Sequence, residues 1–240
     1  MICLEEMKLL KKEMILNPIK KGKNMLLKQL KLASSIDNIV TNCYIVQDEE
    51  TKETIVIDPA GQCDKIVEML NIIEGKLKYI YLTHCHGDHI GAAEELKNVK
   101  NSKILIHIDD YEGLKEPEIN LTGFMSEKQI RLEADARVND GDILHIGNLE
   151  FKVIHTPGHT KGGSSLYCAK EQLLFSGDTL FKGMWGRTDL PTSSFEDIIN
   201  SITNKLLVLP DETIVYPGHG MSTRIAQEEP IYYNLIPGEE

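Results

Sequence analysis

Long hydrophobic runs are absent from this 240-residue sequence, and cysteines are few. No run approaches the roughly 18 consecutive apolar residues of a membrane-spanning helix, so we expect no membrane partner. The N-terminus does not resemble a secretory signal, since Glu5, Glu6 and Glu13 interrupt its short apolar runs. The five cysteines are scattered, odd in number and without a Cys-x-x-Cys pair, which argues against a disulfide framework. These absences predict a cytoplasmic protein.

Positive charge is also scarce. The chain carries 26 lysines and arginines against 37 aspartates and glutamates, a net charge of −11. Residues 1–24 hold six lysines and three glutamates, or +3, which leaves −14 for the remainder. A protein that binds nucleic acid through its phosphates needs the opposite balance, so we expect no nucleic-acid partner. Apolar residues make up 41% of the chain, enough to bury a sizeable core.

Residues 1–24 differ from the rest of the chain. An amphipathic helix is predicted up to Asn17-Pro18, followed by a flexible basic linker of sequence KKGKN. We interpret this stretch as a basic N-terminal extension, an accessory tail rather than a partner-binding helix. Residues 25–240 are predicted to form a single domain.

From residue 25 onward, short β-rich runs alternate with helical periodicity. Strands are predicted at 26–32, 42–48, 53–59, 77–84, 103–108, 141–147, 149–159, 163–170, 172–178 and 212–219, with the four from 141 to 178 forming two hairpins. Helices are predicted at 63–75, 89–98, 109–114, 193–209 and 222–230, and a loop-rich connection at 116–139. Two strand ends, HTPGH at 155–159 and VYPGH at 215–219, resemble each other and indicate equivalent loops at one sheet edge.

Three histidines and an aspartate fall within six positions of the stretch THCHGDHIG (83–91), although the whole chain has only eight histidines. Side chains i and i+2 of an extended segment share a direction, so His84 and His86 can face one point. The glycine that follows allows a sharp turn, after which Asp88 and His89 leave on a different heading. One ion would struggle to use all four side chains, whereas two adjacent ions could take two each. We therefore predict metal ligands here rather than structural histidines.

Three further candidate ligands follow small residues at other predicted strand ends. His159 follows Thr-Pro-Gly, Asp178 follows Ser-Gly and His219 follows Tyr-Pro-Gly. Loops at strand ends are where a rigid scaffold presents chemistry. Seven ligands, one of them a bridging carboxylate, would give each of two ions four protein contacts, as four-coordinate zinc requires. On spacing alone, these three residues remain open between a ligand and a structural role.

The motif T-H-x-H-x-D-H, here THCHGDH, is the signature of the metallo-β-lactamase-fold hydrolases. The later stretches TPGHTKGG, FSGDTLF and YPGHG, in that order, resemble the remaining ligand loops of that superfamily. The segment FSGDTLFKGMWGRTDLP resembles the glyoxalase II-like branch, the hydroxyacylglutathione hydrolases and their short bacterial relatives. The resemblance extends over roughly residues 25–235.

This resemblance implies an α/β fold, a four-layer αβ/βα sandwich with the site at one edge. It implies one ion on His84, His86 and His159, a second on Asp88, His89 and His219, and Asp178 as the bridge between them. Full-length glyoxalase II resembles this core with an added C-terminal helical domain that grips glutathione. Only 21 residues follow His219 here, so we expect a short form without that domain.

These features predict a metal-dependent hydrolase that cleaves a small-molecule thioester related to hydroxyacylglutathione. Two divalent ions are expected, zinc first, with iron or manganese as alternatives. A metal-bridging hydroxide would attack the carbonyl carbon, while Asp88 would bind metal and orient the nucleophile. The alternatives within the same fold are a mononuclear-iron persulfide dioxygenase, a lactonase or other ester hydrolase including a β-lactamase, and a nuclease. A binding module without catalysis is the non-enzymatic alternative.

Other polar residues near the motifs receive structural interpretations. His107 and His145 lie in apolar strands, and Cys85 points away from the neighbouring ligands. His155 is expected to make a hydrogen bond at the end of its strand. The alternative is that it contacts a metal ligand and orients it. In the loop after Asp178, Trp185, Arg187 and Asp189 could line the substrate entrance, or Arg187 and Asp189 could pair to brace the loop.

Overall fold

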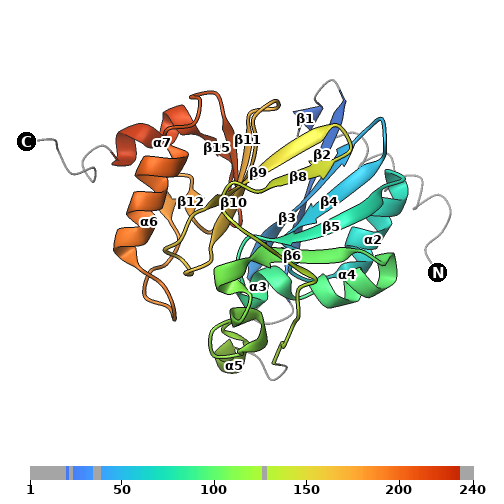
Figure 1. Ribbon diagram of the computed structural model, residues 1–240, viewed down its shortest axis with the longest axis horizontal. Coiled ribbons are helices and arrows are strands. Elements are labelled where there is room, and N and C mark those ends of the chain that lie inside the picture. The colour runs from blue at the N-terminus through green and yellow to red at the C-terminus, as the bar shows by residue number, and fades with distance from the viewer. Residues whose placement is uncertain (1–19, 22–23, 35–38, 126–128, 233–240) are drawn as a thin grey trace, which may run out of the picture.

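The computed structural model describes residues 20–21, 24–34, 39–125 and 129–232. Two β-sheets pack against each other, and helices cover the outer face of each sheet, at opposite sides of the molecule in Figure 1. The predicted αβ/βα sandwich is therefore confirmed.

The first sheet has seven strands in the order of the sequence. These are β1 (Lys20–Lys21), β2 (Met25–Ala33), β3 (Val40–Asp48), β4 (Glu53–Ile57), β5 (Lys76–Leu82), β6 (Lys103–His107) and β7 (Ala136–Val138). Strands β1 to β4 pair antiparallel, whereas β4 to β7 pair parallel. The crossovers from β4 to β5 and from β5 to β6 pass through α2 (Cys63–Ile72) and α4 (Ala93–Lys100), respectively.

The second sheet has six strands in the order β15-β14-β11-β10-β9-β8. Their bounds are β8 (Ile143–Ile146), β9 (Leu149–His155), β10 (Ser164–Cys168), β11 (Leu173–Gly177), β14 (Ile214–Pro217) and β15 (Thr223–Arg224). The predicted β8–β9 and β10–β11 hairpins are confirmed. The β8–β9 turn is Gly147-Asn148, and its glycine has φ 57, as a two-residue hairpin turn requires. A small separate hairpin joins β12 (Leu180–Phe181) to β13 (Met184–Trp185).

Three apolar clusters hold the four layers together. The outer face of the first sheet packs on α2 and α4 through residues such as Ile66, Leu70 and Leu96. A second cluster fills the space between the sheets, with Phe151 and Phe175 fully buried. The third lies between the second sheet and α6 (Phe195–Ser201), the π-helical segment η3 (Ile202–Leu206) and α7 (Ile225–Tyr232).

The strand directions bring several loops to one edge of the sandwich. Strands β4, β5 and β6 are parallel, so their carboxyl ends lie at the same edge of the first sheet. In the second sheet, β9 and β11 are each antiparallel to β10, and β14 is parallel to β11, so these three also end together. The main-chain N–H of Ser164 donates to the Thr83 carbonyl at 2.9 Å and joins the two sheets at this edge.

Four local predictions need correction. The helix predicted at 89–98 is split into α3 (Gly87–Ile90) and α4, because the Ala92 N–H donates to the Pro59 carbonyl instead of continuing the helix. The helix predicted at 109–114 is two short 3-10 turns, η1 (Ile108–Asp110) and η2 (Gly113–Lys115). The helix predicted at 222–230 begins as β15, which pairs with β14.

The fourth correction concerns the predicted basic linker, in which Lys20–Lys21 pair with β2 as a strand. The helix predicted before Asn17-Pro18 lies outside the described residues. The connection at 116–139 contains the short helix α5 (Thr122–Met125) as well as β7. Among the described residues, no helix combines the length and apolar character needed to cross a membrane.

Candidate metal centre

All seven side chains that the sequence suggested as ligands meet at the shared edge of the two sheets. His84 and His86 follow β5, and Asp88 and His89 lie in α3 directly after them. The second sheet contributes His159 after β9, Asp178 after β11 and His219 after β14. The two Pro-Gly-His loops therefore lie at one edge of the second sheet, as their resemblance indicated.

His84, His86 and His159 form the first group, here called the three-histidine group. Their rings are nearly perpendicular to one another, at 87°, 79° and 88°, with centroids 4.6 to 4.8 Å apart. Perpendicular rings can point three in-plane nitrogen lone pairs at one position. His86 Nδ1 lies 2.9 Å from His159 Nε2, so those two nitrogens already converge.

Asp88, His89 and His219 form the second group, here called the Asp88 group. Asp88 Oδ2 lies 3.2 Å from His219 Nε2 and 3.6 Å from His89 Nε2. Ligand atoms with bonds of 2.0–2.1 Å in tetrahedral zinc stand about 3.4 Å apart, so this spacing suits a single ion.

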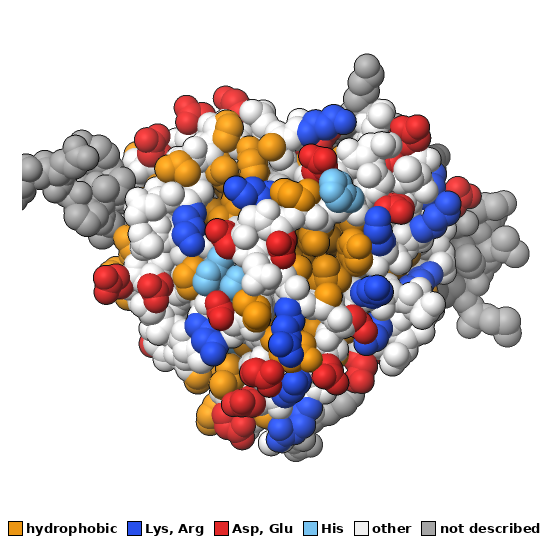
Figure 2. Space-filling model, in the orientation of Figure 1, with side chains coloured by type: hydrophobic (Ala, Val, Ile, Leu, Met, Phe, Trp, Pro, Cys, Tyr) orange, Lys and Arg blue, Asp and Glu red, His pale blue; other side chains and the backbone are white. Residues whose placement is uncertain are grey.

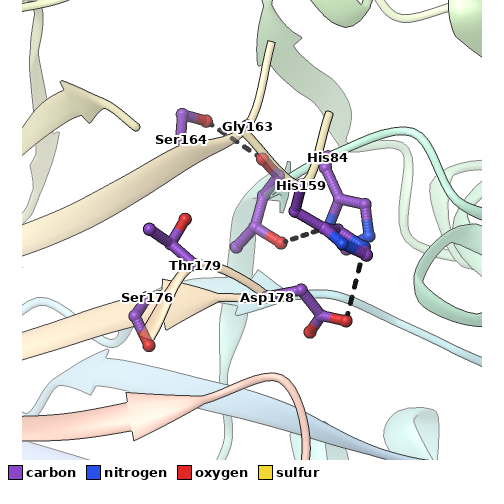
Figure 3. Close-up of a pocket in the computed structure, with 8 residues that line it drawn as sticks. His84, His159, Gly163, Ser164, Ser176, Asp178 and Thr179 are labelled. Carbon is purple, nitrogen blue, oxygen red and sulfur yellow. Dashed lines mark hydrogen bonds and ion pairs between the residues drawn. The ribbon is translucent and has the colours of Figure 1, made fainter. Parts of the chain in front are cut away.

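Asp178 contacts both groups. Its Oδ2 lies 3.5 Å from His159 Nε2 in the three-histidine group and 3.4 Å from His219 Nε2 in the Asp88 group. Its Oδ1 lies 3.4 Å from His89 Nε2. Figure 3 shows the Asp178 carboxylate directed at His159. This is the placement that a carboxylate shared by two ions requires.

Four of the five histidines are oriented by a partner of their other ring nitrogen. His89 Nδ1 donates to Asp58 Oδ2 at 2.9 Å, and His84 Nδ1 lies 3.1 Å from Thr83 Oγ1. His159 Nδ1 donates to the Arg187 carbonyl at 2.9 Å, and His219 Nδ1 to the Val40 carbonyl at 3.0 Å. A carbonyl oxygen can only accept, so the Nδ1 of His159 and of His219 carries a proton, and Nε2 is the nitrogen that faces the centre. Metal-binding histidines are held in this way.

Unpartnered atoms support the same interpretation. Within the described part of the chain, His84 Nε2, His86 Nε2 and Asp178 Oδ1 are buried without a hydrogen-bond partner. Leaving a buried polar atom unsatisfied costs about 1–3 kcal/mol, so His84 Nε2 and Asp178 Oδ1 call for a ligand at the centre, whereas His86 faces His159 through Nδ1 and its Nε2 points away. Imidazole nitrogen and carboxylate oxygen are donors that zinc, iron and manganese accept. The residues present therefore fit a binuclear metal site.

The charge states of the two groups differ. Burial lowers the pKa of His84 well below its usual value, and repulsion from His89 lowers it further. Burial, helped by His159, lowers the pKa of His86 to about 3. Both side chains are thus neutral at pH 7 and ready to bind an ion.

In the Asp88 group the carboxylates reverse the effect of burial. Burial opposes a charged imidazole, but Asp178 raises the pKa of His219 to about 10, and Asp88 raises that of His89. Burial likewise opposes the charged carboxylates, yet His89 lowers the pKa of both Asp88 and Asp178. In the protein without metal, two imidazolium groups pair with two carboxylates, and an ion would replace their protons.

The absence of a side chain at Gly218 makes room for two of the ligands. A Cβ at this position would lie 2.6 Å from His89 Cε1 and still closer to Asp178 Oδ1. The glycine of the sequence Pro-Gly-His is therefore required by the packing of two ligands against the backbone.

A pocket of about 310 Å³ opens onto the centre. Its polar side is formed by ligands of both groups, and its remaining wall by Ile39, Leu121, Phe181, Leu190 and Arg187. The Asp88 and His219 side chains are 16% and 24% exposed, whereas those of His89 and Asp178 are 0% and 9% exposed. A substrate in this pocket would therefore meet the Asp88 side of the centre. The volume is at the lower end of the range for small-molecule sites, about 300–1,000 Å³.

Behind the ligands, hydroxyl side chains fill the space between the sheets. Figure 3 shows Ser164, Ser176 and Thr179 around His84, His159 and Asp178. The Thr83 hydroxyl donates to Asp58 Oδ2 at 2.8 Å and also contacts His84. These contacts close the rear of the centre and leave the pocket as the route of entry.

A separate group, His107, Asp109 and His155, also gathers potential ligand atoms but has the wrong geometry. The rings of His107 and His155 are stacked at 11° with centroids 4.0 Å apart. An ion must lie in the plane of each imidazole that binds it, and two parallel planes share no such point. His155 Nε2 instead donates to the Lys161 carbonyl at 2.9 Å. The structural interpretation of both histidines is confirmed.

The other predicted roles have mixed outcomes. Cys85 is fully buried and packed, as expected. His145 lies in β8, as expected, with its side chain exposed and 3.8 Å from Glu150, and it belongs to none of the possible metal groups of the described residues. Arg187 does both things considered for it, because it lines the pocket and pairs with Asp189 through two contacts of 2.9 Å.

Sequence reasoning missed the residues that orient the ligands. Asp58 was visible only as the end of the run ETIVIDP, and Asp110 as an acid after a strand. Asp58 is buried against His89, and Asp110 accepts hydrogen bonds from two ligand loops. Strand-end position was the available signal, since both acids follow parallel strands that end at this edge.

Comparisons with known proteins agree with this geometry. The family model described as "Metallo-beta-lactamase superfamily" matches residues 36–219. The chain is 33% identical to the hydroxyacylglutathione hydrolase GloC of Haemophilus influenzae over 78% of this chain and 89% of that protein. It is 35% identical to the BLEG-1 B3 metallo-β-lactamase, covering 85% of this chain and 96% of that one with a TM-score of 0.79. It is 26% identical to TTHA1623, solved in a di-iron-bound form, covering 88% and 96% with a TM-score of 0.66. The chain therefore belongs to the metallo-β-lactamase superfamily, as a metal-dependent hydrolase with a histidine-rich centre.

Proposed function

We propose that this protein hydrolyses small-molecule thioesters, converting a hydroxyacylglutathione-like thioester and water into a carboxylic acid and a thiol. The observation that carries the proposal is the position of Asp178, whose carboxylate contacts both ligand groups at the base of an open pocket. The similarity to a hydroxyacylglutathione hydrolase, at 33% identity, supports the choice of a thioester.

The three-histidine group would hold one divalent ion and the Asp88 group the other, with Asp178 shared. Two such ions supply an activated water near neutral pH and polarise a carbonyl oxygen. Zinc is our first choice of metal, with iron or manganese as alternatives, because all accept nitrogen and oxygen ligands.

The chain itself contributes orientation and exclusion of solvent. Asp88 lines the pocket, and its lowered pKa keeps it ionised at pH 7, so its carboxylate can accept a hydrogen bond from the attacking water. Leu121, Phe181 and Leu190 provide an apolar wall for the acyl group or the thiol carrier. The departing thiol has an ordinary pKa of about 8.5, so its departure needs no separate acid among the pocket residues.

Hydrolysis of S-lactoylglutathione, measured together with metal content, tests this proposal. We expect two ions per chain and rapid thiol release. Asp88→Asn should reduce the rate at least about 100-fold, because it removes the charge that orients the water. Asp211→Asn, at an exposed loop position before β14, is the matched control and should leave the rate unchanged. Full activity and full metal content in Asp88→Asn would refute the role of Asp88.

Hydrolysis of a β-lactam is a second candidate, favoured by the likeness to a B3 metallo-β-lactamase. A chromogenic cephalosporin measured on the same preparation separates the two substrates. One iron per chain with oxygen consumption would instead support an oxygenase and contradict both hydrolytic proposals. On the face shown in Figure 2, acidic and basic side chains are interspersed, which gives a nuclease no support.

A further inference from the structure

Asp110 is a buried carboxylate that touches none of the seven ligands and yet contacts two of the loops that carry them. It ends η1, directly after β6, and only 2% of its surface is exposed. Its Oδ2 accepts from the Cys85 N–H at 2.9 Å and from the Thr160 hydroxyl at 2.8 Å. Its Oδ1 accepts from the Gly162 N–H at 2.8 Å.

These three donors flank the members of the three-histidine group. Cys85 lies between His84 and His86, in the loop after β5 of the first sheet. Thr160 follows His159, in the loop after β9 of the second sheet. One carboxylate therefore fixes the distance between the two loops whose nitrogens must converge on a single ion.

The close fit at Gly162 shows how tightly this contact is built. A Cβ on Gly162 would lie 2.6 Å from Asp110 Oδ1 and even closer to the Asp110 backbone nitrogen. The first glycine of the stretch KGG is thus explained by its close packing against Asp110.

The Asp88 group is oriented by other partners. Its His89 is held by Asp58, and its His219 by the Val40 carbonyl. Asp58 also reaches His84 through Thr83, so it serves both groups. The hydrogen bonds of Asp110 reach only the two loops of the three-histidine group.

We propose that Asp110 is a positioning residue that sets the metal affinity of the three-histidine group and leaves that of the Asp88 group unchanged. The inference rests on the metal centre of the proposed function and is independent of the substrate. Partners that orient ligands typically change metal affinity by about 10–100-fold, and that is the effect expected here.

Asp110→Asn is the direct test, since it keeps the shape and replaces one accepting oxygen by an NH₂ group. That group must face either Gly162 N–H or the pair of donors at Oδ2, so at least one hydrogen bond is lost. Zn²⁺ affinity is measured by competition with a chromophoric chelator in two backgrounds of the full-length protein. His219→Ala leaves the three-histidine group intact, and His159→Ala leaves the Asp88 group intact.

We expect Asp110→Asn to weaken Zn²⁺ binding about 10–100-fold in the His219→Ala background and not in the His159→Ala background. Equal losses in both backgrounds, or no loss in either, would overturn the proposal. Thr160→Val removes a single hydrogen bond and covers the case in which Asp110→Asn does not fold. It should weaken the same group by a smaller factor, whereas Thr160→Ser should restore it. A wild-type protein that binds two Zn²⁺ without cleaving thioesters would refute the substrate and leave this inference standing.

Discussion

Replacing Gly218 by alanine should damage the Asp88 group specifically. The added Cβ would lie 2.6 Å from His89 Cε1, whereas ordinary contacts begin at 3.4 Å, so His89 must retreat by about 0.8 Å and Asp178, which is closer still, by more. The backbone has little freedom to move instead. The Gly218 N–H donates to the Gly177 carbonyl at 2.8 Å, and the Gly218 carbonyl accepts from the Asn42 N–H at 2.8 Å. The displacement therefore falls on His89 or Asp178.

A displacement of that size exceeds what a metal site tolerates. Ligand distances are expected to hold within about 0.2 Å, so the Asp88 group should lose at least about 10-fold in affinity. A 1 Å misplacement near reacting groups costs about 100-fold in rate, and we expect a similar loss of hydrolysis. Overpacking should lower the free energy of unfolding of the metal-free protein by about 1–3 kcal/mol.

Gly220→Ala is the matched control, two residues along the same loop. Gly220 has φ 76 and open space around the missing Cβ, so alanine there strains the backbone without touching a ligand. It should cost about 1–2 kcal/mol of stability and leave metal content unchanged. Metal analysis, chelator titration and urea unfolding of both variants measure these effects. A Gly218→Ala protein that binds two ions with wild-type affinity would refute the steric reasoning.

Three further results are expected. Asp58→Asn should weaken Zn²⁺ binding about 10–100-fold in a chelator titration, because His89 Nδ1 loses its acceptor; unchanged affinity would contradict this. The metal-free protein should lose stability as pH rises from about 6.5 through about 10, since the folded pKa of His219 is raised to about 10 and its favourable protonation is lost there; greater stability by urea unfolding at the upper end would be inconsistent. Metal binding at pH 7 should release protons from His89 and His219, and calorimetric heats that do not depend on the buffer would count against it.

Most strands could be predicted because they are short, apolar and separated by turn residues, whereas the four-layer sandwich was implied by the resemblance to the metallo-β-lactamase fold. The β8–β9 hairpin follows from alternating burial on either side of Gly147-Asn148. Errors occurred where a tertiary contact decided the outcome. Thr223 pairs with Val215 at the sheet edge, although its neighbours have helical spacing. Ala92 breaks a helix because its N–H is taken by the Pro59 carbonyl, a contact that no local pattern records.

Four ligands could be proposed from their clustering in THCHGDH. His159, Asp178 and His219 each follow a small residue at a strand end, and the resemblance to the superfamily's ligand loops supported them. The ligands meet only if the strands that carry them end at the same edge of the sandwich. That depends on whether neighbouring strands pair parallel or antiparallel. Asp178 and His219 come together since β11 and β14 are parallel neighbours, a relation across 36 intervening residues that spacing does not reveal. Asp58 and Asp110 escaped detection for a related reason, because an acid at a strand end has the same local signature whether it faces solvent or a ligand.

Each half of the centre takes ligands from both sheets. The three-histidine group joins the loop after β5 to the loop after β9, and the Asp88 group joins α3 to the loop after β14. Any ion bound here would therefore connect the two sheets at the edge where polar contacts, such as Ser164 N–H to the Thr83 carbonyl, already join them. Binding free energy adds to the stability of whichever state holds the ligands together. The position of the centre thus couples metal loading to the packing of the sandwich. Asp110 joins a loop of each sheet at the same edge, so its hydrogen bonds contribute to that packing as well as to the three-histidine group.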